Sequence, residues 1–331
     1  FPYTDIISYG FCFSLIKYLQ DEIKSKSKII VVLQNLHSYN NYMIIRKCKN
    51  IPLVIQQRSH IPPVFKNSIF KMWSPYSPKI RYPLQNLIEN RYFSNIDFLF
   101  ANGYLSEAFF SKRYGTNKSI RLHNTGYNFK EAEKRNIRHE VKESDVINIL
   151  AISRFTKIKG AREIILAYNK LKKIIPCKLF FVGPTKGNLH DAKLMEIAKK
   201  SGVIIKGYVP NQELLKLMRK MHINWAYHSG IHVFFGGLTS SSIESMSMNI
   251  PQISNQLVNF PSEDFSKIGL YAKSYEDIVE MTIQLIDNLE SFDEVHDEAK
   301  RHYDWKNITK IHEAKYKDLF NSYYNSKKGK T

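Results

Sequence analysis

The stretch of sequence that decides the fold lies between residues 146 and 183. It begins VINILAISRFTKIKG (146–160), continues as a helical pattern, and closes KLFFVG (178–183). An apolar run, a short polar loop, an amphipathic segment and a second apolar run predict strand, loop, helix and strand. Arg154 and Lys159 lie in the loop where the helix begins. Free N–H groups and the helix dipole attract anions at such a position, so the first hypothesis is a ligand that carries phosphate.

The alternative for this pair is two solvated surface cations, which is the simpler interpretation when the loop is taken alone. Arg offers a planar fork of donors and Lys a point charge, and the two residues, five positions apart across the loop, can both reach one diphosphate. The helix that follows, Ala161 to Ile175, carries an apolar face and is expected to pack on the core. The rest of the chain has to decide between a phosphate site and two unrelated charges.

Length and composition place the chain among globular proteins with two domains. It has 331 residues, 43% of them hydrophobic and 24% charged, which is too long for one ordinary core. No apolar run reaches the 18 residues that a transmembrane helix needs. The three cysteines, Cys12, Cys48 and Cys177, are far apart. They favour a reducing compartment over a disulfide framework or a zinc site.

The formal net charge of +19 has two interpretations that we weigh equally. One is attraction to a polyanion: nucleic acid, an anionic membrane surface or phosphorylated substrates. The other is a compositional bias toward lysine, because the lysines are dispersed along the chain. The sequence holds no nucleic-acid module signature, and we therefore expect no nucleic-acid partner.

Apolar runs alternate with helical patterns along most of the chain, which predicts an α/β protein with mostly parallel sheets. The first half contains strand candidates at 5–9, 28–33, 51–55, 95–101 and 119–122, with helices at 13–23 and from Ser106. The second half contains strands at 146–152, 178–182, 203–206, 222–227 and 250–254, and helices at 160–174, 188–200, 211–220, 240–248, 275–290 and 305–323. The charged stretch between the halves lacks apolar periodicity and is the best linker candidate. The expected architecture is two doubly wound domains with a ligand cleft between them.

A second group of chemically suggestive residues is FGGLTSSSIE (235–244). The glycine pair lets a backbone approach a ligand closely, and the hydroxyl run is typical of a helix N-cap. Glu244 then falls near the start of that helix, where a carboxylate could accept from sugar hydroxyls. The alternative is a flexible loop followed by a carboxylate that only interacts with the helix dipole. The histidines are scattered without metal-ligand spacing, so no metal site is expected.

Taken in order, the motifs resemble those of glycosyltransferase family 4, the retaining enzymes with the GT-B fold (glycosyl transferases group 1). The match rests on motifs across about residues 90–323: NIDFLFAN (95–102), HNTG (123–126), SRFTKIKG (153–160), KLFFVG (178–183), VIIKGYVP (203–210), GLTSSSIESMSMNIP (237–251) and DW (304–305). Each motif is modest, but their order is specific.

The resemblance implies a role for each matching position. Arg154 and Lys159 would bind the donor diphosphate and steady the leaving group. Glu244 would hold the donor ribose. Two further segments would complete the donor site: the nucleobase would meet Gly207, Tyr208 and Val209, and the phosphates would meet Gly236, Gly237, Leu238, Thr239 and Ser240. No metal or other cofactor is expected, because cations and helix dipoles can neutralise a diphosphate.

The chain departs from the family pattern at several places. The family has two glutamates eight positions apart, and the first falls here on Gly236, which puts donor-sugar choice and activity in doubt. Asn249 replaces a common glycine. The family's first strand and Gly-rich loop are not seen before Asp5, so we expect an incomplete N-terminal domain. An acceptor-side histidine would follow the strand at 51–55, and His60 is the candidate, with Arg58 close behind.

The sequence therefore predicts a retaining glycosyltransferase that moves a hexose from a UDP or GDP sugar to a hydroxyl of a glycan, a lipid carrier or a protein. The expected domains are an acceptor-side domain (1–129), a linker (130–145), a nucleotide-sugar domain (146–303) and a C-terminal helix that returns to the first domain (304–331). A cytoplasmic location with peripheral contact to an anionic inner membrane face is expected. The alternative is a catalytically degenerate sugar-nucleotide-binding subunit that partners an active transferase.

Overall fold

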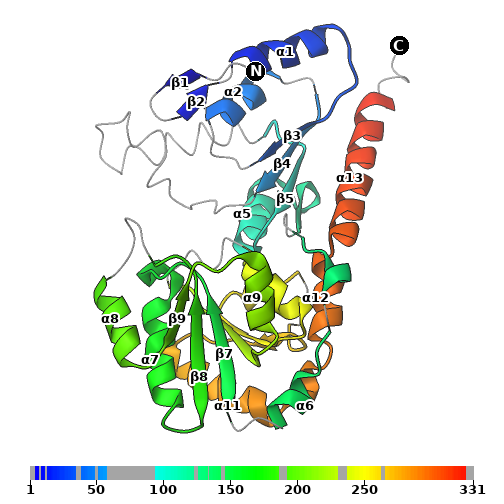
Figure 1. The fold of residues 1–331 in the computed structure, drawn as a ribbon. Coiled ribbons are helices and arrows are strands. Elements are labelled where there is room, and N and C mark those ends of the chain that lie inside the picture. Colours follow the sequence, from blue (N-terminus) through cyan, green and yellow to red (C-terminus); the bar gives the residue numbers. More distant parts are fainter. Residues whose placement is uncertain are drawn as a thin grey trace. The chain divides into compact units, whose positions relative to one another are not determined.

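The protein forms two compact units, each with its own parallel sheet (Figure 1). The first unit comprises Phe1–Asn124 and Thr309–Thr331, and the second unit comprises Thr125–Ile308. The computed structural model describes residues 4–6, 9–11, 13–34, 39–48, 51–57, 94–122, 126–132, 134–142, 146–185, 192–229, 237–261 and 265–325. The predicted α/β class with two Rossmann-like units is confirmed.

The second unit is built on a six-stranded parallel sheet in the order β12-β11-β10-β7-β8-β9. Its strands are β7 (Ile147–Ile152), β8 (Cys177–Val182), β9 (Ile204–Gly207), β10 (Ile223–Ala226), β11 (Gln252–Ser254) and β12 (Gly269–Leu270). Counted along this unit, the order is 3-2-1-4-5-6 reversed end to end, which is that of a dinucleotide-binding Rossmann sheet. The chain switches direction between β7 and β10, where Ile223 pairs with Ile149.

Helices cover both faces of this sheet. They are α7 (Ala161–Leu171), α8 (Ala192–Lys200), α9 (Asn211–Met218), α10 (Ser240–Ser247), α11 (Tyr275–Asp287) and α12 (Val295–Tyr303). Parallel strands connect through right-handed crossovers, so α7 and α8 lie on one face and α9 and α10 on the other. Accordingly, α7 packs against α8 and α11, while α10 packs against α12. The capping box of Ser274 and Asp277 fixes the start of α11.

The core of the second unit follows from its sequence pattern. Ile149, Leu150 and Ala151 are fully buried, as expected for a central strand covered on both faces. On α7, the apolar positions Ile164, Ile165, Tyr168 and Leu171 are all buried. Because β7 and α7 are both packed into the core, the loop that joins them is held at both ends.

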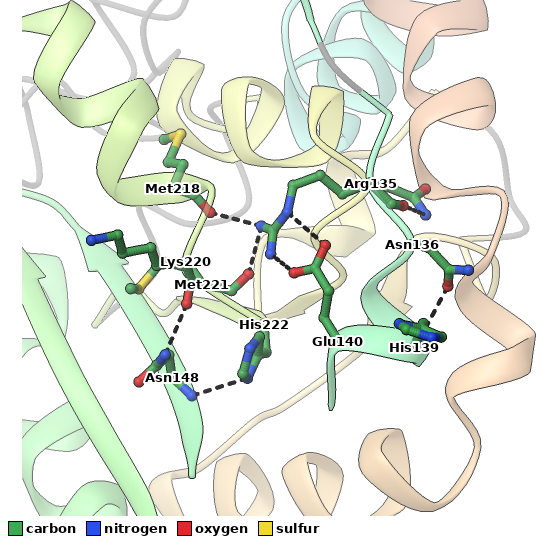
Figure 2. Close-up of polar contacts among 10 residues, drawn as sticks. Arg135, Asn136, His139, Glu140, Asn148, Met218, Lys220, Met221 and His222 are labelled. Atoms are coloured by element: carbon green, nitrogen blue, oxygen red, sulfur yellow. Dashed lines mark hydrogen bonds and ion pairs between the residues drawn. The ribbon is translucent and has the colours of Figure 1, made fainter. Parts of the chain in front are cut away.

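Part of the charged stretch 130–145, which was predicted as a linker, packs on the core of the second unit. Helix α6 (Ile137–Lys142) buries Ile137 and Val141 in that unit's core. Just before α6, the buried Arg135 donates to the carbonyls of Met218 and Met221, both at 2.8 Å, and pairs with Glu140 (Figure 2). The guanidinium thereby ties the segment before α6 to the turn that follows α9.

Two segments that the sequence analysis singled out separately meet in the second unit. Tyr127 N donates to the Tyr303 carbonyl at 2.8 Å, and Trp305 N donates to the Tyr127 carbonyl at 3.2 Å. The backbone of Gly126 lies against the Trp305 ring. Gly126 of one motif and Trp305 of the other therefore form a single contact at the start of the last helix.

The first unit contains a four-stranded parallel sheet in the order β3-β4-β5-β6. Its elements are β1 (Thr4–Ile6), β2 (Tyr9–Phe11), α1 (Phe13–Lys24), β3 (Val31–Gln34), α2 (Tyr39–Lys47), β4 (Leu53–Gln57), β5 (Phe98–Ala101), α5 (Tyr104–Tyr114), β6 (Ser119–Arg121) and most of α13 (Trp305–Asn325). Gln56 donates to the Tyr316 hydroxyl at 2.9 Å, so α13 packs beside the central strands of this unit.

The observed elements differ from the predicted ones mainly at short or local structures. The expected strand at 5–9 is an antiparallel pair, β1 with β2. The sequence analysis did not predict α2, α6, α12 or the two-residue strand β12. These elements are short, or are recognisable only from the neighbours they pack on. In the part of the chain that the structure describes, no helix is both long enough and apolar enough to cross a membrane.

Candidate functional site

The candidate site lies at the carboxyl edge of the second unit's sheet, at the point where the strand order reverses. β7 and β10 are neighbours there, but the connection after β7 runs to one side and the connection after β10 runs to the other. In open α/β sheets this divergence leaves a crevice in which ligands bind. Arg154 and Lys159 follow β7, and Tyr227 and His228 follow β10.

Alternation of buried and exposed residues positions Arg154. Phe155 is fully buried and packs edge-on against Phe181, with ring centroids 4.8 Å apart. The Ser153 N–H donates to the Val182 carbonyl at 3.0 Å, which ties the loop to the neighbouring strand. With its backbone held on both sides, Arg154 is exposed to solvent, where its guanidinium can reach a ligand.

Gly160 brings Lys159 beside the end of β10. It has φ +68 and ψ 15 between the short helix η3 (Lys157–Lys159) and α7. A Cβ on this residue would lie 2.4 Å from the Tyr227 carbonyl oxygen, so a side chain there would push the two segments apart. The close approach leaves the Lys159 Nζ 3.5 Å from Nε2 of His228.

The electrostatics of the pair favour an anion. Lys159 is half-buried, and burial together with the neighbouring Arg154 lowers the pKa of its ammonium group. Among the residues that the structure describes, no carboxylate forms an ion pair with either cation. Two neighbouring cations without a counter-charge repel each other, and a bound phosphate would remove that repulsion.

The N-terminus of α10 lies at the same edge of the sheet. Thr239 is its N-cap, and the Thr239 hydroxyl accepts from the Ser242 N–H at 3.2 Å. The Ser241 hydroxyl donates to the Ile152 carbonyl at 3.4 Å, two residues before Arg154. Leu238 is buried beneath this turn, whereas Ser240 is exposed. The first N–H groups of the helix therefore lie near the loop after β7, where they can donate to an anion.

Glu244 and the segment after β9 flank this centre. Glu244 lies in the second turn of α10, half-buried, and burial raises the pKa of its carboxyl group. Gly207 ends β9 with φ +67, and its carbonyl accepts from the Gly183 N–H at 2.8 Å. Tyr208 next to it is 78% exposed, and Val209 is half-buried. β9 is two strands from β7, or about 10 Å along the edge of the sheet.

The structure thus brings together at one edge most of the residues predicted from sequence: Arg154, Lys159, Gly207, Tyr208, Val209, Gly237, Leu238, Thr239 and Ser240 follow its strands or begin α10. His60 and Gly236 lie outside the described residues, as does Arg58. Within the described part of the chain, no cluster of three His, Cys, Asp or Glu side chains could hold a metal. A reaction without metal or cofactor stays a prediction.

Sequence reasoning missed His228, Asn255 and Gln256, which also lie at this edge. The His228 N–H donates to Asn255 Oδ1 at 3.1 Å, the Asn255 amide donates to the His228 carbonyl at 2.6 Å, and the Gln256 amide contacts His228 Nδ1. His228 and Asn255 directly follow predicted strands, and that position was the available signal. What the sequence could not give is the adjacency of β7, β10 and β11.

Comparison with known proteins identifies the fold. HepE from Anabaena, solved in complex with UDP, superposes with a TM-score of 0.65 at 13% identity, over 91% of this chain and 81% of HepE. A glycosyltransferase from Rickettsia africae gives 0.64 at 12% identity, over 96% and 84%. Sucrose-phosphate synthase from Thermosynechococcus elongatus gives 0.61 at 14% identity, over 94% and 79%. No family model and no curated protein matches the chain. The chain has the two-domain, Rossmann-like GT-B fold.

Proposed function

We propose that this protein is a retaining glycosyltransferase that moves a hexose from a UDP or GDP sugar to an acceptor hydroxyl. The observation that carries the proposal is the pair Arg154 and Lys159, two cations without a carboxylate partner among the described residues, at the switch point of a Rossmann sheet. The fold is shared with glycosyltransferases, and HepE is one neighbour solved with UDP. A diphosphate supplies the negative charge that the pair lacks.

The donor would lie along the carboxyl edge of the sheet. In the proposal, Arg154 and Lys159 bind the diphosphate, with N–H groups and hydroxyls from Gly237 to Ser240 completing its coordination. Glu244 accepts from the ribose hydroxyls. Its pKa, raised by burial, would return toward the ordinary range when those hydroxyls donate to it. The nucleobase lies at Gly207–Val209, where the exposed Tyr208 ring offers a stacking surface.

The reaction would proceed by positioning and electrostatic stabilisation. The bond between the sugar C1 and the diphosphate oxygen breaks, and its electron pair stays on the departing diphosphate. The acceptor hydroxyl oxygen forms the new bond to C1 on the same face, and its proton passes to a diphosphate oxygen. Arg154 and Lys159 stabilise the charge that develops on the leaving group, so both would act more strongly in the transition state than on the bound donor.

The test is isothermal calorimetry of the full chain with UDP and with GDP. A charge-assisted hydrogen bond contributes about 1.5–3 kcal/mol, so Arg154→Ala and Lys159→Ala should each weaken binding by about 10- to 150-fold. Lys157→Ala is the matched control, because Lys157 is an exposed lysine on the same short helix and should leave affinity unchanged. Absence of binding to either nucleotide by the wild-type chain would overturn the proposal.

The acceptor would be a glycan, a lipid-linked sugar or a protein, and the surplus of positive charge suits a lipid acceptor at an anionic membrane face. Co-sedimentation with liposomes tests this part separately. Binding should rise with the fraction of anionic lipid and fall with salt. Sedimentation that does not change with anionic lipid content would remove the membrane from the proposal and leave the glycan or protein acceptor.

A second candidate function is a degenerate sugar-nucleotide-binding subunit that partners an active transferase. It is favoured by Gly236, which stands where the resembling family has the first glutamate of its pair. Release of free sugar or transfer to an acceptor distinguishes the two. Nucleotide binding that is abolished by Lys159→Ala, without any turnover of UDP- or GDP-hexoses, would favour the binding subunit.

A further inference from the structure

His228 contacts Lys159 across the switch point, and its ring is held on both sides. Its Nε2 lies 3.5 Å from the Lys159 Nζ, and its Nδ1 contacts the side-chain amide of Gln256. The His228 backbone N–H and carbonyl both form hydrogen bonds with the Asn255 side chain, which fixes the position of His228. The imidazole therefore links Gln256, which follows β11, to Lys159, which follows β7.

The donors and acceptors of Gln256, His228 and Lys159 restrict which hydrogen bonds the three side chains can form with one another. A neutral imidazole has one N–H donor and one acceptor nitrogen, and an ammonium group only donates. With the Gln256 Nε2 donating to Nδ1, the ring proton would have to sit on Nε2, where it would point at the ammonium of Lys159. That arrangement places two donors against each other on the Lys159 side.

The Gln256 amide also allows the opposite arrangement. Its side chain is only 2% exposed, and its Oε1 accepts no hydrogen bond from the described residues. A buried amide oxygen without a donor is unfavourable by about 1–3 kcal/mol. Exchanging the amide oxygen and nitrogen presents Oε1 to Nδ1–H, which gives the oxygen its donor but moves the amide NH2 to the position without a partner among the described residues. The Lys159 side therefore decides between the two arrangements, because the exchange removes the two opposed donors there. The proton is then on Nδ1, and the Nε2 lone pair faces Lys159.

We propose that Gln256, His228 and Lys159 form a relay that positions the Lys159 ammonium for the donor phosphate. Gln256 Oε1 accepts from His228 Nδ1–H, which fixes the tautomer, and His228 Nε2 accepts one N–H of Lys159. The other two N–H groups of the ammonium remain for phosphate oxygens. His228 is thus a positioning residue that acts through Lys159. The nucleotide-binding consequence rests on the proposed function, whereas the relay itself does not.

The ligand-free test of the relay is the tautomer of His228. Long-range proton–nitrogen correlation spectra of the full chain, labelled with ¹⁵N-histidine and recorded at pH 8, distinguish the two neutral forms. His228→Gln identifies the signal by its disappearance. The expected result is the Nδ1–H form in the wild type, and loss of that preference in Gln256→Leu. An Nε2–H form in the wild type would overturn the relay whether or not any nucleotide binds.

The second test is a double-mutant cycle on UDP and GDP affinity. His228→Leu should weaken binding by about three- to tenfold, the range of one hydrogen bond. It should have no further effect in a Lys159→Ala background. His228→Gln keeps an acceptor near the position of Nε2 and should retain most of the affinity, unlike His228→Leu. Additive losses would mean that His228 contacts the ligand itself and would refute the positioning role. If the wild type binds neither nucleotide, the proposed function fails and the tautomer alone decides on the relay.

Discussion

Replacement of Gly160 by alanine tests the close approach that assembles the site. Gly160 adopts a left-handed conformation, φ +68 and ψ 15, which costs an L-residue about 1–2 kcal/mol. The added Cβ would also lie 2.4 Å from the Tyr227 carbonyl oxygen and 2.8 Å from the Tyr227 ring. Overpacking of this kind costs about 1–3 kcal/mol. The free energy of unfolding of the second unit should therefore fall by about 2–5 kcal/mol.

A matched control separates the two contributions. Gly202, in the turn after α8, also has a positive φ, +79, but a Cβ there would meet no atom within 4 Å. Gly202→Ala should therefore show the conformational cost alone, about 1–2 kcal/mol. The difference between the two variants, about 1–3 kcal/mol, measures the packing of Gly160 against the end of β10.

The assay is urea unfolding followed by tryptophan fluorescence in a Trp73→Phe background. The remaining tryptophans are Trp225, buried with its N–H donating to Thr282 at 3.1 Å, and Trp305. Nucleotide affinity is measured on the same proteins. Gly160→Ala should lose affinity, since relief of the clash moves Lys159 away from His228, and Gly202→Ala should keep it. Equal destabilisation by both variants, or full affinity in Gly160→Ala, would refute the reasoning.

Two further predictions concern the second unit. His222 accepts from the Asn148 N–H at 3.2 Å, and burial with the nearby Arg135 lowers its pKa (Figure 2). As pH falls below about 6.5, the unfolded chain therefore binds a proton at His222 before the folded chain does. The free energy of unfolding should then decline by up to about 1.4 kcal/mol per pH unit. Urea midpoints measured between pH 5 and 8 should show a shallower decline in His222→Asn than in the wild type. Tyr208→Ala should leave the urea midpoints unchanged, because the Tyr208 side chain is 78% exposed. The same variant should lower nucleotide affinity, measured by calorimetry, by about tenfold, because a stacking contact with the nucleobase is lost. Unchanged affinity would contradict a nucleobase at this position.

The sequence was informative where local patterns carry the structure. The strands β7 and β8 and the helix α7 could be placed within a few residues, because a buried parallel strand and an amphipathic helix each leave a period in the sequence. Arg154 and Lys159 could be singled out because they follow a strand and precede a helix. The packing of Arg135 could not be predicted from the stretch 130–145, since it depends on carbonyls about 85 residues downstream.

What the sequence alone determined is the class of fold and the chemistry at each strand end: which residues are cationic, which helix begins with hydroxyls, and where a glycine is needed. What only the tertiary structure decided is which strand ends are neighbours. Strand order depends on long-range packing and not on local period, so nothing near Lys159 in the sequence points to His228 or Gln256. The reversal between β7 and β10 places these residues side by side, and it turns two cations in a loop into a site with defined neighbours.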